Sequence, residues 1–203
     1  MKILIERKAL PEIETDALVL LGFEGTPPAM GAAALIQELY DSGEFSGKSL
    51  ESAILHRPAG LKAKRLVLAG AGKRDRFDSA ELRKLIGATL RTLKAKSVHS
   101  ITLVLDEAFR SDEFGAAAVE GALLADLEAD RYKTDPKKDE KYVDSFAVTG
   151  ISEAGLARGV AIAESQNFAR ALANEPANVL TPLCLAEKAK EMAAEQKLEL
   201  ATT

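Results

Sequence analysis

Short apolar runs alternate with longer stretches of helical periodicity along most of the chain. Five runs have the length of a β-strand, and they lie at residues 3–5, 17–23, 53–55, 66–69 and 101–105. The second, fourth and fifth are almost continuously apolar, which is typical of strands covered by helices on both faces. We expect these three in the middle of a sheet, and an edge strand at 143–148. The alternation predicts an α/β fold.

Two helices carry clear start signals. Asp78 or Ser79 can cap a stretch in which five apolar residues recur at helical spacing, namely Leu82, Leu85, Ile86, Leu90 and Leu93. Ser111 stands in the same way before a second helical stretch, which runs toward Leu127. We expect the apolar stripe of the first helix to pack on the sheet.

In the last quarter of the chain, two predicted helices follow one another without a strand between them. Residues 153–172 have near-helical spacing of apolar residues (Leu156, Val160, Ala163 and Ala171), and Pro176 ends this helix. Thr181 and Pro182 then begin another helix with Leu185, Ala189, Met192 and Ala193 on one face, and a strand begins near Leu198. A helix and a strand fragment cannot bury both their faces alone. We therefore predict an α/β domain at 1–151, a linker helix at 152–173, and the start of a truncated second domain at 174–203.

Composition and charge exclude several classes of protein. The chain is 47% apolar and 29% charged, as in ordinary globular proteins, and no apolar run approaches the ~20 residues of a membrane helix. The net charge of -4 gives no general attraction for nucleic acid or anionic membranes. The single cysteine, Cys184, and the absence of a signal-peptide pattern favour the cytoplasm. The charge-balanced run at 130–144 predicts an exposed loop.

No residue pattern in the chain has the spacing of a known catalytic or metal site. Gly70 and Gly72 with Lys73 follow a strand but lack the remaining positions of either phosphate-binding motif, so a structural turn is favoured. His56 and His99 have no ligand partners nearby in sequence, and we expect them to be structural or on the surface. Cys184 is expected to be a buried thiol in a first helical turn.

The segment 167–182, followed by Leu185-Ala-Glu, resembles the leucyl aminopeptidase family, also called the cytosol aminopeptidases. In that family a run of the type Asn-x-Ala-Arg-x-Leu-x-Asn-x-Pro-x-Asn-x-x-Thr-Pro leads from the linker helix into the catalytic domain. Residues 65–73, Glu120-Gly-Ala-Leu-Leu and Arg131-Tyr-Lys agree with the same family. The resemblance covers most of the chain, weakly before residue 60 and sharply at its end.

The resemblance implies a two-domain, cytoplasmic metallopeptidase that releases N-terminal amino acids from peptides, with two divalent ions (Zn or Mn), assembled as a homo-hexamer. It also implies an N-terminal domain with a macro-domain-like mixed sheet flanked by helices. The motifs that bind the metals in the family do not occur here. We therefore assign no catalytic, cofactor-binding or metal-binding residue to this chain, and expect it to be inactive alone, with a structural role in assembly. Arg170, Asn174, Pro176 and Asn178 are placed at the domain junction.

Two other functions stay open at this stage. A macro-like module could bind ADP-ribose or another nucleotide at residues 70–73. An accessory domain could instead bind DNA through a basic patch, for which the sequence offers Lys62, Lys64, Arg65, Lys73, Arg74 and Arg76.

Overall fold

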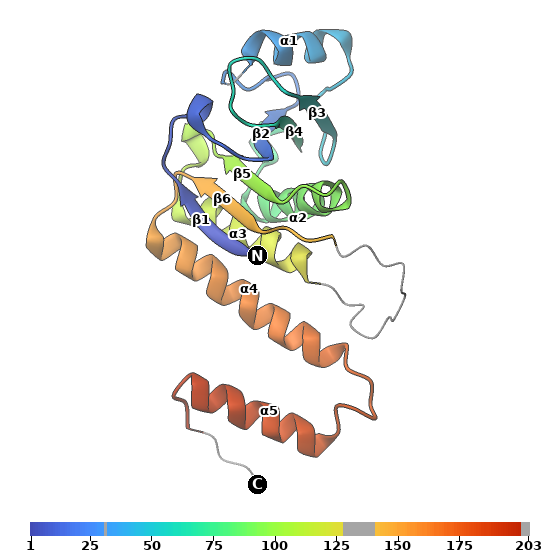
Figure 1. The fold of residues 1–203 in the computed structure, drawn as a ribbon, viewed down its shortest axis with the longest axis vertical. Coiled ribbons are helices and arrows are strands. Elements are labelled where there is room, and N and C mark those ends of the chain that lie inside the picture. Colours follow the sequence, from blue (N-terminus) through green and yellow to red (C-terminus); the bar gives the residue numbers. More distant parts are fainter. Residues whose placement is uncertain (31, 128–140, 200–203) are drawn as a thin grey trace. The chain divides into compact units, whose positions relative to one another are not determined.

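The computed structural model describes residues 1–30, 32–127 and 141–199, and a six-stranded sheet is formed between residues 2 and 149 (Figure 1). Its strands are β1 (Lys2–Glu6), β2 (Ala17–Phe23), β3 (Ser52–His56), β4 (Arg65–Gly72), β5 (Ser100–Val104) and β6 (Ser145–Thr149). Their order is β1-β6-β5-β2-β4-β3. All neighbouring strands are parallel except β3, which is antiparallel to β4. The predicted mixed α/β sheet is confirmed.

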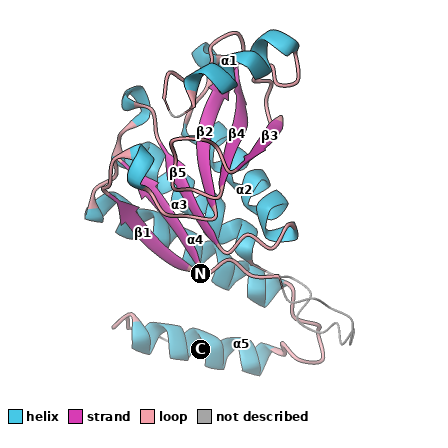
Figure 2. Ribbon diagram, turned by 45° about the horizontal axis from the view of Figure 1, so that its top comes forward, coloured by secondary structure: helices cyan, strands magenta, loops and turns pink. Residues whose placement is uncertain are grey.

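Helices α1 (Ala33–Ser42), α2 (Ser79–Ala95) and α3 (Asp112–Asp126) flank this sheet (Figure 2). Two further helices, α4 (Glu153–Ala173) and α5 (Pro182–Glu195), follow β6 in the chain. Side chains of β2 alternate between its two faces, as those of any strand do. Leu18 and Leu20 pack in one buried cluster with residues of α1, whereas Val19 and Leu21 pack in another with residues of α2 and α3. Both faces of the central strands are therefore covered, which explains their continuous apolar sequence.

The predicted helix starts at Asp78, Ser111 and Thr181 are confirmed. The side chain of each accepts a hydrogen bond from the backbone N–H three residues later. The apolar stripe of α2 is fully buried, from Leu82 to Leu93. Helix α4 ends at Ala173, shortly before Pro176.

Several expectations are wrong. Strand β6 lies between β1 and β5 rather than at an edge, because the first strand pairs on its outer side. Of the four apolar residues expected along α4, Ala163 is buried and Leu156 and Val160 pack against the core, whereas Ala171 is exposed. Cys184 is half-buried rather than buried. The sequence also gave no signal for α1, whose first residue is preceded by Ala32, a residue without a capping side chain.

The described chain divides into two compact units, Met1–Ser165 and Gln166–Thr203, and α4 belongs partly to each. The domain boundaries at 151/152 and 173/174 stay predictions. Most of the charged run at 130–144, and all but two residues of the strand expected after Leu198, lie outside the described residues. Within the described residues, the structure contains no helix with the length and apolar character needed to span a bilayer.

Candidate functional site

The carboxyl ends of β2 and β5 are the first place to look for a ligand site. The chain leaves β2 toward one edge of the sheet and β5 toward the other, and ligands of open α/β sheets bind at such a reversal of strand order. Here aromatic rings fill this place. Phe23, at the end of β2, lies 5.2 Å from Phe77 and 5.5 Å from Phe109 between ring centroids, and all three are buried.

The side chain of Arg74 covers the aromatic rings at the same end of the sheet. The guanidinium carbon of Arg74 lies 4.9 Å from the centroid of Phe23 and 5.2 Å from that of Phe109, and its Nη1 is 3.6 Å from Asp106 Oδ2. Rings and a paired guanidinium therefore occupy the position where a nucleotide would enter a fold of this kind.

The glycines at 70 and 72 serve packing rather than phosphate binding. Both belong to β4, so the turn predicted there is wrong. The N–H of Gly70 donates to the carbonyl of Glu51 (2.7 Å), and the N–H of Gly72 donates to that of Gly47 (2.8 Å). A side chain at Gly70 would collide with the carbonyl of Lys48. These amides already have partners, so they are not available to cradle a phosphate.

The six basic residues do not form one patch. Lys62, Lys64 and Arg65 lie before or at the start of β4, whereas Lys73, Arg74 and Arg76 follow its end. Eight residues of extended strand separate the two groups by roughly 25 Å. Lys62 and Lys64 also pair with acidic side chains, Lys62 with Glu12 and Lys64 Nζ with Asp16 Oδ1 at 2.7 Å. This arrangement gives no support to a DNA-binding face.

Asp16, which the sequence did not single out, ties together the starts of two central strands. Its Oδ2 accepts hydrogen bonds from the N–H of His99 (3.0 Å) and of Ser100 (3.2 Å). Partial burial opposes ionisation of this carboxyl, but the hydrogen bond from Lys64 and those two N–H groups outweigh it. The pKa of Asp16 is therefore lowered. The contacts are with the fold itself, so this carboxylate is structural.

The two histidines and the cysteine do not come together. His56 ends β3, whereas His99 precedes β5 and its ring lies 4.8 Å from that of Tyr142 between centroids. Cys184 lies in α5, in the other unit. Across residues 1–30, 32–127 and 141–199, no three histidine, cysteine or acidic residues are grouped as metal ligands. The described residues therefore do not fit the pair of metal ions that the resemblance implies.

A small-residue contact joins α4 to α3. A side chain at Gly159 would lie 2.8 Å from the carbonyl oxygen of Ala116 and 2.9 Å from Cβ of Val119. At the start of α4, Asp112 accepts hydrogen bonds from both the N–H and the hydroxyl of Ser152, at 3.0 and 2.8 Å. The first turns of α4 are thus fixed to the first unit by close backbone approach and by a charged hydrogen-bonding pair.

The second unit exposes much of its apolar surface. Five large hydrophobic residues within it are at least two-fifths exposed, namely Phe168, Val179, Leu183, Leu185 and Leu198. The residues assigned to a domain junction lie here as well. Arg170 Nη1 donates to Asn167 Oδ1 (3.1 Å), and the carbonyl of Pro176 accepts from Val179 N–H (2.8 Å). Their assignment to a junction stays a prediction.

Comparisons with known proteins give a consistent answer. The sequence model described as the cytosol aminopeptidase family, N-terminal domain, matches residues 29–136. A probable cytosol aminopeptidase of Solibacter usitatus is 51% identical over 98% of this chain, which covers 41% of the relative. One of Acidobacterium capsulatum is 35% identical over 98% of this chain and 44% of its own length. This chain spans about two-fifths of the length of these curated relatives.

Solved structures share the fold. A tomato leucine aminopeptidase mutant superposes with a TM-score of 0.78 and 23% identity, over 96% of this chain and 42% of that one. The bottromycin maturation enzyme BotP in complex with Mn has a TM-score of 0.73 and 24% identity, over 92% of this chain and 38% of that one. At 23–24% sequence identity, these matches support a shared fold and no more.

Proposed function

The chain belongs to the cytosol aminopeptidase family and carries its N-terminal domain, and from this we propose that it is the non-catalytic part of a metal-dependent aminopeptidase. The activity proposed for the whole protein is release of N-terminal amino acids from peptides. The N-terminal domain holds the linker helix and supports assembly, while the active site belongs to sequence that corresponds to the rest of the relatives.

The observation that carries this proposal is the combination of coverage and chemistry. Almost all of this chain aligns with about two-fifths of each relative, yet the described residues hold no three-ligand group for a metal ion. Hydrolysis assisted by two metal ions needs several carboxylate or nitrogen ligands close together. Because the chain matches the N-terminal domain of the family, we assign the aminopeptidase chemistry to sequence outside it.

Helix α4 is the element through which the N-terminal domain acts. Its first turns are fixed to α3 through Ser152 and Gly159, and its last turns belong to the second unit. The exposed apolar side chains of the second unit, including Leu183 and Leu185, are proposed to pack against the rest of the intact protein.

Further properties of the whole protein follow from the family and are proposals. They are two divalent ions, Zn or Mn, in the catalytic domain, peptide substrates, assembly as a homo-hexamer, a cytoplasmic location and a macro-domain-like N-terminal domain. BotP, which shares the fold, has been solved in complex with Mn, and this supports manganese as one candidate.

The proposal is tested with this chain alone. Hydrolysis of leucine p-nitroanilide is measured with Mn²⁺ or Zn²⁺ added, and metal content is measured after equilibrium dialysis. We expect no activity above buffer and no stoichiometric binding of two ions. Turnover by the purified chain, abolished by a chelator, would overturn the assignment of the active site to other sequence.

A further inference from the structure

A pocket opens at the carboxyl ends of three parallel strands. It has a volume of about 530 Å³ and lies where β1, β5 and β6 end, beside the segment that follows β1. This volume is within the range of small-molecule sites. The aromatic cluster of Phe23, Phe77 and Phe109 lies at the neighbouring ends of β2 and β5, and none of its residues lines this pocket.

The wall of the pocket is mostly apolar. Six aliphatic or thioether side chains from four segments contribute to it, namely Ile5, Leu10, Ile13, Met30, Val104 and Ile151. Ile13, Val104 and Ile151 are buried, so they form a fixed floor rather than a mobile rim. An apolar group of a ligand that rests on this floor would gain free energy by covering the partly exposed side chains beside it, Ile5, Leu10 and Met30.

A cation is held at one side of the pocket. Arg110 lines it, and its Nε donates to the carbonyl of Leu105 (3.2 Å). Gly150, with φ +71°, makes room for this side chain, because a Cβ there would lie 2.5 Å from Arg110 Cγ. The fold thus holds the guanidinium at the pocket through one donor, and a guanidinium can bind a carboxylate through two parallel hydrogen bonds.

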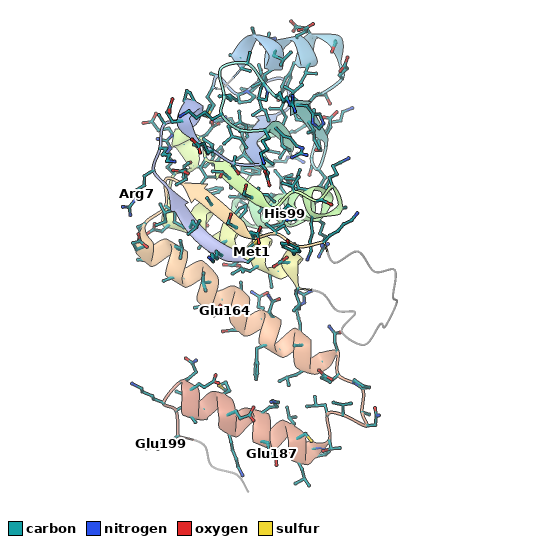
Figure 3. All side chains as sticks on the ribbon, in the orientation of Figure 1. Met1, Arg7, His99, Glu164, Glu187 and Glu199 are labelled. Atoms are coloured by element: carbon teal, nitrogen blue, oxygen red, sulfur yellow. The ribbon has the colours of Figure 1, made fainter. Side chains whose placement is uncertain are left out.

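An anion lines the same pocket. Glu6 accepts hydrogen bonds from the N–H groups of Arg7 and Lys8, both at 2.9 Å and both through Oε1. Arg7 itself is less suited to a ligand. Its side chain is 75% exposed, projects away from the sheet (Figure 3) and pairs with Glu153 Oε1 at 2.9 Å.

We propose that this pocket binds a free apolar α-amino acid, with its carboxylate at Arg110, its ammonium group at Glu6 and its side chain on the apolar floor. The lining holds three basic residues, Arg7, Lys8 and Arg110, and one carboxylate, Glu6, so a plain amine is repelled, whereas a zwitterion can pair its carboxylate with Arg110 and its ammonium group with Glu6. The inference rests on the proposed function in one respect: such amino acids are the products of an aminopeptidase, and the pocket would report their concentration.

The test is binding to this chain, which needs no catalytic domain. Chemical shifts in ¹⁵N spectra are followed during titration with leucine, with 4-methylpentanoate, which lacks the ammonium group, and with 3-methylbutylamine, which lacks the carboxylate. We expect saturable shifts around Gly150 and Ile13 with leucine and at least about tenfold weaker binding of both analogues. Failure to saturate at about 20 mM leucine, or equal binding of either analogue, would overturn the proposal.

Variants locate the site. Arg110→Gln and Glu6→Gln are expected to weaken leucine binding by about tenfold or more, while Arg91→Gln, on the exposed side of α2, leaves it unchanged. Arg110→Lys keeps the charge without the bidentate fork and should bind at an intermediate strength. Both Arg110 variants lose the Nε–H donor to the Leu105 carbonyl, so the difference between them reports on the charge. If a folded Glu6→Gln variant binds leucine with unchanged affinity, the ammonium contact at Glu6 does not exist and the proposed zwitterionic ligand is contradicted. A failed leucine titration leaves the proposed aminopeptidase function standing, and a failed activity assay leaves the binding result standing.

Discussion

Asp112 and Ser152 join the first turns of two successive helices across 40 residues of sequence. Both hydrogen atoms that Ser152 can donate, from its N–H and its hydroxyl, go to the Asp112 carboxylate. The same hydroxyl accepts from the N–H of Gly155 (3.1 Å), so Ser152 also caps α4. One charged group thereby fixes the start of the helix that links the two units.

Acid should weaken this joint. The hydrogen bonds from Ser152 hold the pKa of Asp112 below its ordinary value. A lowered pKa in the folded state contributes stability above the unfolded-state pKa of about 4, and that contribution is lost as pH falls toward the folded-state pKa. Urea midpoints measured from pH 7 down to pH 3 should fall less steeply in Asp112→Asn than in the wild type, and Asp112→Asn should be less stable at pH 7. Parallel curves for the two proteins would contradict the prediction; Asp75→Asn serves as an exposed control.

A larger side chain at Gly159 should force α4 away from α3. The nearest atoms to a Cβ there belong to Ala116 and Val119, and the backbone carbonyl of Ala116 cannot move without disturbing α3. Overpacking of this kind costs about 1–3 kcal/mol. Urea denaturation should show Gly159→Leu destabilised by that amount, whereas Ala157→Leu, on the exposed side of the same helix, changes stability little. Equal stability of the two variants would show that the helices do not pack as described.

Glu51 acts as an internal anion for the turn before β3. Its Oε2 accepts hydrogen bonds from Ser46 N–H, Ser46 hydroxyl and Lys48 N–H, each at 3.0 Å. Burial opposes ionisation, but these donors outweigh it, so the pKa of Glu51 is lowered. Glu51→Ala leaves the donors without their anion and should cost about 1–3 kcal/mol in free energy of unfolding.

An added anion should restore part of the stability lost in Glu51→Ala, because successive backbone N–H groups bind phosphate. Thermal unfolding is compared in phosphate and in chloride at equal ionic strength. The variant should gain more from phosphate than either the wild type or Glu44→Ala, a control in the same loop. Identical gains for all three proteins would count against a vacated anion site.

The sequence predicted the elements better than their arrangement. Continuous apolar runs identified β2, β4 and β5, and the residues Asp78, Ser111 and Thr181 marked helix starts correctly, because capping and burial are local properties. The family resemblance came from one short segment, residues 167–182, whose residue types and spacing are unusual. The matches to known proteins confirm it.

What the sequence missed depends on contacts between distant residues. The place of β6 inside the sheet depends on β1 pairing with it, 143 residues away for Lys2 and Ser145. The contact of Gly159 with Ala116 has no hydrophobic periodicity to reveal it. Arg110 and Glu6 line one pocket only because β6 brings the carboxyl ends of β1 and β5 to either side of its own, and neither residue belongs to a recognisable motif.

A chimera tests the central claim most directly. This chain replaces the corresponding first two-fifths of the Solibacter usitatus relative, and metal-dependent hydrolysis of leucine p-nitroanilide is measured beside the unmodified relative and this chain alone. If the chain is the non-catalytic N-terminal domain of the family, the chimera retains activity within about tenfold, while this chain alone has none. A folded chimera without activity, or metal-dependent turnover by this chain alone, would contradict the account.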